Sequence, residues 1–210
     1  MSLQAVQERM AAACAAADRD VGEVSLVVVT KGRSVEAVAD LYDRGQRDFG
    51  ENRAQELLDK VPQLPGDIRW HFVGPLQRNK VKAVRPVVSK LHSLDRIKLA
   101  AAWAGEGEAP PALLEINLGE EPQKHGFAPS AASAAAQEVI DLGVALTGVM
   151  AIPPASEPAA GHFERLVGIR DELALGHPQV REVSAGMTDD FEKAIRAGAT
   201  TIRVGRAIFE

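Results

Sequence analysis

A lysine closely follows a run of apolar residues near the start of the chain. The run is Leu26-Val27-Val28-Val29, and the lysine is Lys31. Such runs are typical of strands buried on both faces. An amine at the end of a buried strand loses hydration, which favours its neutral, nucleophilic form and allows a Schiff base with a carbonyl ligand. The same spacing fits a lysine whose stem packs on the fold while its ammonium reaches water, so both interpretations stay open.

Hydroxyl-bearing residues, glycines and one arginine form a second cluster towards the C-terminus. They are Ser184, Gly186, Thr188, Gly205 and Arg206. Glycines let backbone N–H groups approach an anion closely, and hydroxyl groups add further donors. The cluster therefore predicts a phosphate site. A plain turn at Gly186 and a helix cap at Thr188 would give the same sequence, which leaves a structural alternative.

The lysine and the phosphate site together indicate a phosphorylated carbonyl ligand. Pyridoxal 5′-phosphate (PLP) is the commonest ligand of this kind that a lysine holds. An enzyme that binds a phosphorylated sugar, without pyridoxal, is a further alternative.

Short strand-like runs that alternate with helical patterns organise the chain. The expected strands are 26–29, 48–50, 68–72, 90–94, 112–116, 145–149, 182–184 and 201–204. The expected helices are 3–17, 34–45, 53–60, 80–84, 96–102, 130–141, 159–174 and 190–196. Alternating strands and helices form right-handed β-α-β units, so this pattern predicts one α/β domain over residues 1–210, a (β/α)8 TIM barrel. A doubly wound open sheet is the alternative, but no glycine-rich loop of that fold follows the first strand.

The last expected helix has clear sequence boundaries. Asp189 and Glu192 have the spacing of a capping box, which predicts the start of the helix. Gly198 follows the final turn and predicts its end.

In a parallel barrel the functional residues lie at the carboxyl ends of the strands. The residues at these positions are Lys31, Asn52, His71, His92, Asn117, Met150, Ser184 and Arg203. Histidines at strand ends raise the alternative of a metal-dependent hydrolase. The first strand ends in Thr-Lys rather than in the H-x-H pattern of such enzymes. We therefore expect no metal site and interpret His71 and His92 as structural residues.

Composition and charge exclude several classes of protein. The chain has 210 residues, 46% of them hydrophobic and 25% charged, and a formal net charge of −5. The acidic balance argues against nucleic-acid binding, and no apolar run is long enough to span a membrane. The only cysteine, Cys14, excludes an internal disulfide. We expect a cytoplasmic monomer without a signal peptide.

Several short motifs occur in a specific order along the chain. They read LVVVTKGRSVEAV, DFGENRAQELLDK, WHFVGPLQRNK, LHSLDR, EINLGEEPQKHGF, GVMAIPP and VSAGMTDDFEKAIRAGATTIRVGRAIF. Together they resemble the YggS/PROSC family of pyridoxal phosphate homeostasis proteins, from about Leu26 to Phe209. The resemblance implies PLP as the cofactor. It also implies the barrel of the alanine racemase N-terminal domain, without the second, β-rich domain of that enzyme.

The resemblance also implies roles for individual residues. Lys31 would form the Schiff base, and Arg203 would face the pyridine nitrogen of PLP. The Ser184 hydroxyl and the backbone of Gly205 and Arg206 would bind the phosphate. The predicted cofactor-binding set is Lys31, Asn52 beside the cofactor, Met150 near its ring, Ser184, Gly186, Thr188, Arg203, Gly205 and Arg206. The chain departs from the usual family pattern at Arg53, Pro75, Ala185 and Glu210, where tyrosine, histidine, methionine and glycine are usual.

These implied roles favour a carrier of PLP over an efficient enzyme. A guanidinium at the pyridine nitrogen disfavours protonation of that nitrogen, which weakens the ring as an electron sink. Racemisation also needs a base on each face of the substrate, and racemases of this barrel take a tyrosine from the second domain of a partner subunit. The only tyrosine here, Tyr42, lies on an expected amphipathic helix. We predict a protein of vitamin B6 homeostasis whose partners are PLP and PLP-dependent apoenzymes, with an amino-acid racemase as the alternative.

Overall fold

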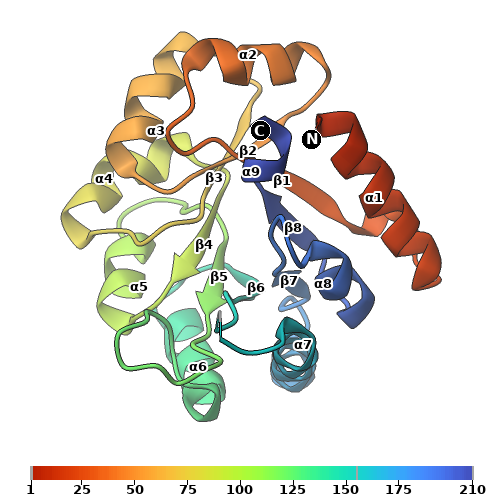
Figure 1. Cartoon of the computed structure of the whole chain (residues 1–210). Helices are drawn as coiled ribbons and strands as arrows, with labels where there is room; N and C mark the ends of the chain where they lie inside the picture. Colours follow the sequence, from red (N-terminus) through yellow and green to blue (C-terminus); the bar gives the residue numbers. More distant parts are fainter. Residues whose placement is uncertain (1, 155, 210) are drawn as a thin grey trace.

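The strands of the chain close into a parallel barrel. A computed structural model describes residues 2–154 and 156–209, and its strands pair in the order β1 to β8, with β8 returning to β1 (Figure 1). The strands are β1 (Ser25–Val29), β2 (Asp48–Glu51), β3 (Arg69–Phe72), β4 (Lys90–Leu94), β5 (Ala112–Glu115), β6 (Leu146–Met150), β7 (Glu182–Ser184) and β8 (Thr201–Val204). The predicted single-domain α/β barrel is confirmed, and the open-sheet alternative is wrong because β1 pairs with β8.

Helices surround the barrel and connect its strands (Figure 1). They are α1 (Leu3–Ala16), α2 (Val35–Asp43), α3 (Ala54–Lys60), α4 (Val81–Val84), α5 (Ile97–Ala104), α6 (Ala132–Asp141), α7 (Ala159–Gly176), α8 (Phe191–Ala197) and α9 (Arg206–Phe209). The predicted helices agree with these bounds to within a few residues. The short helix α9 was not expected, and it lies beside the ends of β1 and β8 (Figure 1).

The side chains of β1 show how the strands divide the interior. Leu26 and Val28 are buried in the hydrophobic core, together with apolar side chains of the helices. Val27 points into the barrel instead, because a Cβ added at Gly50 would lie 2.9 Å from its Cγ1. An apolar run without alternation is therefore required, since both faces of the strand are buried.

The start of α8 differs from its prediction. The N-cap residue is Asp190, one residue later than expected, and its carboxylate accepts the backbone N–H of Met187 at 2.6 Å. Glu192 pairs with Arg9 of α1, with Nε and Oε1 2.7 Å apart, so it does not close a capping box. Tertiary contact with α1 has overridden the local pattern. The end of the helix is confirmed, because Gly198 has a φ of 114° there.

Two other features of the described residues bear on function. None of the helices they form is long and apolar enough to cross a membrane. They also contain no group of three or more His, Cys, Asp or Glu side chains placed to hold a metal ion. Cys14 is buried on α1 as a small apolar side chain.

Candidate functional site

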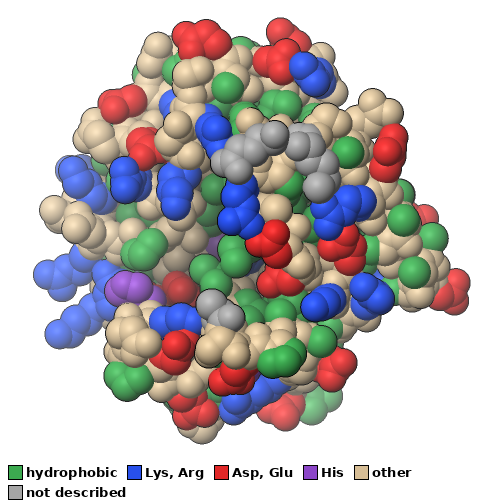
Figure 2. Space-filling model, viewed as in Figure 1, with side chains coloured by type: hydrophobic (Ala, Val, Ile, Leu, Met, Phe, Trp, Pro, Cys, Tyr) green, Lys and Arg blue, Asp and Glu red, His purple; other side chains and the backbone are tan. Residues whose placement is uncertain are grey.

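A cavity of about 480 Å³ opens at the carboxyl ends of the barrel strands. Its lining residues come mainly from the loops after β1, β2, β7 and β8: Val29, Lys31, Arg33, Asn52, Val73, Ile152, Met187, Thr188, Asp189, Arg203, Gly205 and Arg206. In the space-filling view this face is hollowed near its centre, and Lys and Arg side chains lie along the rim (Figure 2). The barrel therefore has its cavity where parallel barrels carry their sites.

Six of the nine predicted cofactor-binding residues line this cavity. They are Lys31, Asn52, Thr188, Arg203, Gly205 and Arg206. The other three predicted residues do not line it. Ser184 and Met150 are buried, with 0% and 1% of their surface exposed. Gly186 has a φ of 91°, and a Cβ there would lie 2.7 Å from the Cβ of Ala194, so this glycine packs a turn against α8.

Lys31 lies at the cavity in a turn after β1, and its side chain is exposed. Of the two interpretations left open by the sequence, this exposure favours the one in which the ammonium reaches water. Burial ends at Thr30, and the turn residues Lys31 and Gly32 are exposed. The turn is fixed on both sides, because the Arg33 N–H donates to the Thr30 carbonyl at 3.0 Å and the Gly32 N–H donates to Glu56 at 2.8 Å. The backbone thus holds Lys31 in place although its amine reaches water.

A buried ion pair lies directly behind the turn that carries Lys31. Lys60 Nζ donates to Glu51 Oε1 at 2.5 Å and to the Thr30 carbonyl at 2.8 Å. The Thr30 hydroxyl donates to the same Glu51 oxygen at 2.6 Å. This cluster links the ends of β1 and β2, and hence the residues Lys31 and Asn52 that follow them. Sequence reasoning missed it, although a lysine and a glutamate in an otherwise apolar setting are its signal.

Asn52 brings an unpartnered polar atom to the cavity. Its side-chain oxygen is buried and has no hydrogen-bond partner among the described residues. Buried polar atoms in folded proteins are nearly always paired, so an orphan at a cavity points to a donor from a ligand or an ordered water. The prediction that Asn52 lies at the site is consistent with this geometry.

Arg203 forms the floor of the cavity from β8 and is only 5% exposed. One terminal nitrogen donates to Ser184 Oγ at 2.6 Å and the other to the Ala151 carbonyl at 3.1 Å. Burial lowers the pKa of Arg203 to about 10, against the opposing effect of the Glu115 charge. The guanidinium is therefore held in place and remains charged at neutral pH.

The two histidines predicted to be structural lie beneath Arg203 in the barrel interior. His92 Nδ1 lies 2.8 Å from Ser184 Oγ, and His92 Nε2 lies 2.9 Å from His71 Nδ1. His71 Nε2 lies 3.1 Å from a carboxylate oxygen of Asp48. These side chains are paired with one another, as expected of structural residues. Their connection to Arg203 was missed, because only the closed barrel brings these strands together.

Glu115 is a titratable residue that sequence reasoning did not single out. It stands at the end of β5 and is partly exposed. Burial, and next the charge of Asp95, raise its pKa to about 7, while Arg203 opposes the rise. The sequence did contain a signal for Glu115, because it is a carboxylate in the last position of an apolar strand. Strand ends of this kind line the site of a parallel barrel.

The chain turns tightly beside Arg203 at Gly205. A Cβ at Gly205 would lie 2.7 Å from the carbonyl oxygen of Val29, so only glycine lets the end of β8 approach the end of β1 this closely. Thr188 faces the same part of the cavity, and its Oγ1 lies 3.4 Å from the Ala207 N–H. Thr188 is not the N-cap of α8, but its hydroxyl accepts an N–H in the first turn of α9, in line with the alternative of a helix cap.

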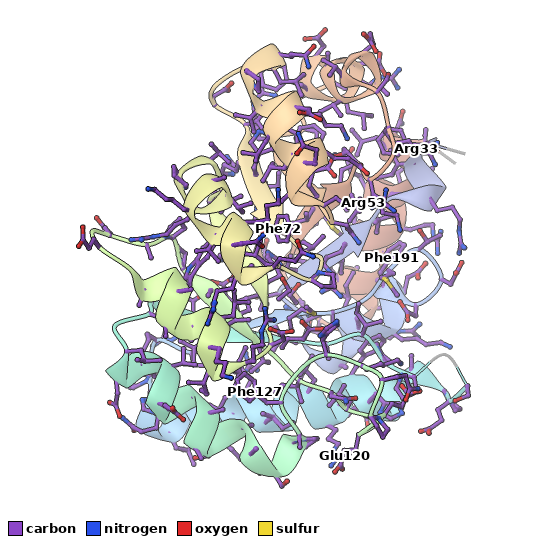
Figure 3. All side chains as sticks on the ribbon, turned by 90° about the vertical axis from the view of Figure 1, so that its left-hand side faces the viewer. Arg33, Arg53, Phe72, Glu120, Phe127 and Phe191 are labelled. Atoms are coloured by element: carbon purple, nitrogen blue, oxygen red, sulfur yellow. The ribbon has the colours of Figure 1, made fainter. Side chains whose placement is uncertain are left out.

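Three of the positions that depart from the family pattern are described by the structure, and none of these three lines the cavity. Arg53 precedes α3, its side chain is 74% exposed, and it pairs with Glu56 at 3.3 Å. Figure 3 shows Arg33 and Arg53 extending from the end of the barrel that carries the cavity. Pro75 is exposed and Ala185 is buried, whereas Glu210 lies outside the described residues.

Tyr42 lies outside the cavity. Its hydroxyl donates to Asp67 at 2.6 Å, and this hydrogen bond, with a smaller contribution from burial, raises the pKa of the phenol. The side chain belongs to α2 on the outer layer of the barrel. The expectation that it supplies no base at the site agrees with this placement.

Comparison with known proteins places the chain in a family. The family model described as alanine racemase, N-terminal domain, matches residues 1–210. Two curated proteins named pyridoxal phosphate homeostasis protein are similar over at least nine tenths of their length. The one from Deinococcus radiodurans is 41% identical and covers 100% of both chains. The one from Pseudomonas aeruginosa is 40% identical and covers 97% of this chain and 91% of its own.

Solved structures agree with this relationship. A protein of unknown function from Bifidobacterium adolescentis matches with a TM-score of 0.92 and 34% identity, over 98% of this chain and 92% of that one. PipY of Synechococcus elongatus, solved with PLP bound, matches with a TM-score of 0.82 and 30% identity, over 98% and 100% of the two chains. Alanine racemase of Corynebacterium glutamicum shares the fold at 14% identity, and this chain covers 61% of it. The chain therefore belongs to the alanine racemase N-terminal domain family, together with the pyridoxal phosphate homeostasis proteins.

Proposed function

We propose that this protein holds PLP as a Schiff base on Lys31 and serves intracellular PLP homeostasis. The observation that carries the proposal is the meeting of Lys31 and Arg203 in one cavity at the carboxyl end of the barrel. The names of the curated relatives and the PLP bound by PipY support the same cofactor.

The residues around the cavity fit the chemistry of PLP. Its aldehyde requires an amine, which Lys31 offers, and its dianionic phosphate requires neutral or cationic donors. Thr188, Gly205 and Arg206 lie together at the cavity and can provide them. The orphaned oxygen of Asn52 suits a ligand donor. A cavity of about 480 Å³ also lies within the ordinary range for cofactor sites.

Each residue has a distinct task in this proposal. Lys31 would hold PLP through its amine, which would form a C=N bond with the aldehyde carbon as water is released. Because the Lys31 side chain is exposed, the proton it must lose can pass to solvent. The network of Lys60, Glu51 and Thr30 keeps the backbone of Lys31 in position during this exchange.

Arg203 limits the chemistry that the bound cofactor can perform. PLP supplies an electron sink for reactions at the α-carbon of amino acids, and this sink is strongest when the pyridine nitrogen is protonated. A fixed guanidinium facing that nitrogen would oppose its protonation. Transamination, which usually relies on a carboxylate at this position, is therefore disfavoured.

The placement of Lys31 and Tyr42 also supports a carrier role. Lys31 can serve one face of a bound amino acid, whereas Tyr42 lies on the outer layer. We propose that the protein acts as a cytoplasmic monomer that passes PLP to PLP-dependent apoenzymes. Amino-acid racemisation is the alternative activity, and it would need a second base.

A titration with PLP tests the proposal. Wild-type protein should develop the absorbance of a PLP Schiff base and restore activity to a PLP-dependent apoenzyme. Lys31→Ala should do neither, while Lys82→Ala, on the exposed side of α4, should behave as wild type. Absence of any spectral change on adding PLP to wild-type protein would refute the proposal.

Proton exchange in heavy water separates the carrier from the racemase. With one base, exchange of the α-proton should be slow and configuration should be retained. A positioned second base contributes about 10²–10⁴-fold, so racemisation should be slower than in a two-base enzyme by that factor. Fast racemisation by the pure protein would favour the alternative.

A further inference from the structure

Five side chains form one continuous line of hydrogen bonds through the barrel interior. The line runs from Arg203 on β8 to Ser184 on β7, His92 on β4, His71 on β3 and Asp48 on β2. The successive distances are 2.6, 2.8, 2.9 and 3.1 Å. One end lies in the cavity floor, and the other lies at the start of β2, at the amino end of the barrel strands.

One assignment of donors and acceptors runs consistently along the whole line. A guanidinium can only donate, so Ser184 Oγ accepts from Arg203, and its single proton is then available for His92 Nδ1. Neutral His92 then carries its proton on Nε2 and donates to His71 Nδ1. His71 in turn donates from Nε2 to the Asp48 carboxylate. Both histidines are thereby the Nε2–H tautomer.

The charged groups around the line support neutral His92. Burial, together with the positive charges of Arg203 and Lys90, lowers the pKa of His92 well below its ordinary value. At the other end, burial alone would raise the pKa of Asp48, but hydrogen bonds from His71 and Arg69 outweigh it and hold that pKa below its ordinary value. The line thus has a cation at one end and a carboxylate at the other.

The remaining charged groups lie beside the line rather than in it. Lys90 pairs with Glu182 at the start of β4 and β7, and Glu115 on β5 acts on Arg203 through its charge. Every N–H and O–H group in the line donates in the direction of Asp48, and every acceptor lone pair faces Arg203. The aligned dipoles therefore stabilise both the Asp48 carboxylate and the Arg203 guanidinium.

We infer that His71, His92 and Asp48 are positioning residues of the cofactor site, which act on it through Ser184 and Arg203. If the guanidinium left Ser184, a fully buried hydroxyl would lose its donor, so the line holds Arg203 in the orientation that faces the cavity. The inference rests on the proposed binding of PLP. It assigns Ser184 to the support of Arg203, beneath the lining of the cavity.

Nitrogen-15 NMR of the cofactor-free protein tests the direction of the line. Wild-type protein should show His71 and His92 as neutral Nε2–H tautomers at pH 7. A protonated His92, or its Nδ1–H tautomer, would overturn the inference, because the Ser184 proton would then have no acceptor in the line. This measurement needs no cofactor, so it remains decisive if PLP fails to bind and the proposed function falls.

A double-mutant cycle tests whether Asp48, at the far end of the line, affects ligand binding in the cavity. Asp48→Asn should weaken PLP binding on the order of fivefold, although Asp48 lies at the opposite end of the barrel strands from the cavity. The control is Glu182→Gln, which breaks the ion pair with Lys90 at the same end of the barrel and should change the affinity less than twofold.

The second arm of the cycle uses Ser184→Ala, which cuts the line in the middle. In that background Asp48→Asn should have no further effect on PLP affinity, because its path to Arg203 is gone. Fully additive effects, or equal effects of Asp48→Asn and Glu182→Gln, would show general destabilisation and overturn the inference. The Asp48→Asn variant should also change the His71 nitrogen spectrum, which Glu182→Gln should leave unaltered.

Discussion

Lys60 at the end of α3 pairs with Glu51 at the end of β2, with Nζ 2.5 Å from Oε1, and both side chains are buried. Glu51 directly precedes the cavity residue Asn52. Lys60 also donates to the carbonyl of Thr30, which directly precedes the cavity residue Lys31. A buried ion pair is weak evidence of net stabilisation, because both charges lose their hydration. Its evident effect here is to fix the relative position of two loops at the cavity.

Removing one member of this pair should strongly destabilise the fold. Lys60→Met leaves the Glu51 carboxylate buried without its counter-charge, which we expect to lower the free energy of unfolding by about 3–5 kcal/mol. Denaturant unfolding monitored by circular dichroism measures the change. Lys82→Met, on the exposed side of α4, is the matched control and should change it by less than about 0.5 kcal/mol. A loss in Lys60→Met no larger than in the control would contradict this account of the pair.

The close approach of β8 to β1 predicts a specific effect of an added methyl group. Gly205→Ala places a Cβ 2.7 Å from the Val29 carbonyl, so the loop must shift. We expect a loss of about 1–3 kcal/mol in unfolding free energy together with weaker PLP binding. Gly168→Ala provides the control, because it lies in α7 with open space around it and should gain up to about 1 kcal/mol. Unchanged PLP affinity in Gly205→Ala would show that this turn does not shape the site.

The raised pKa of Glu115 predicts how the stability of the fold changes with pH. Its pKa is 4.5 in the unfolded reference and about 7 in the folded protein, so the folded state binds more protons between these values. The contribution of Glu115 is therefore fully present below pH 4.5 and is lost as the pH rises through 7, by at most about 3 kcal/mol. Glu115→Gln should match wild type at pH 4 and be more stable than wild type at pH 8.5.

Chemical denaturation of both proteins from pH 4 to 8.5 measures this difference. Taking the difference between the variant and wild type removes the opposite pH dependence of other groups, such as buried His92. Glu138→Gln, on the exposed face of α6, should give a flat difference over the same range. An equally flat difference for Glu115→Gln would contradict the burial of this carboxyl group.

The sequence predicts the barrel well because each strand carries a local signal. The run at Leu26–Val29 and the alternation of strands with helices need no long-range information, and neither does the glycine that ends α8. The start of α8 was placed wrongly because Glu192 pairs with Arg9 of α1, a contact 183 residues away along the chain. The short helix α9 has too few residues to produce a periodic pattern.

The site was predicted less completely than the fold. Lys31 and Arg203 line the cavity as expected, because strand ends of a parallel barrel meet at one edge. The sequence could not reveal that Ser184 points beneath Arg203 or that His92 bonds to it, since these contacts join strands far apart in the chain. It also left the burial of Lys31 open, and the side chain is exposed beyond the last buried residue of β1.

The proposed phosphate contacts predict a strong preference for PLP over pyridoxal. Loss of the phosphate removes several charge-assisted hydrogen bonds, each worth on the order of 1.5–3 kcal/mol, less where water substitutes. Titration calorimetry with both ligands measures the difference. Thr188→Ala, at the cavity, should reduce the preference, whereas Ser133→Ala, on the exposed face of α6, should leave it intact. Equal affinity for pyridoxal and PLP would exclude a phosphate site in this cavity.

The central claim is that Lys31 carries the cofactor, and reductive labelling tests it most directly. Borohydride reduction of the PLP-loaded protein should fix the cofactor on one lysine, followed by digestion and mass spectrometry of the peptides. The account predicts label on Lys31 alone, because it is the lysine that lines the cavity with Arg203. Label on Lys80, Lys82 or Lys193 in its place, or the same labelling pattern in Lys31→Ala, would contradict it.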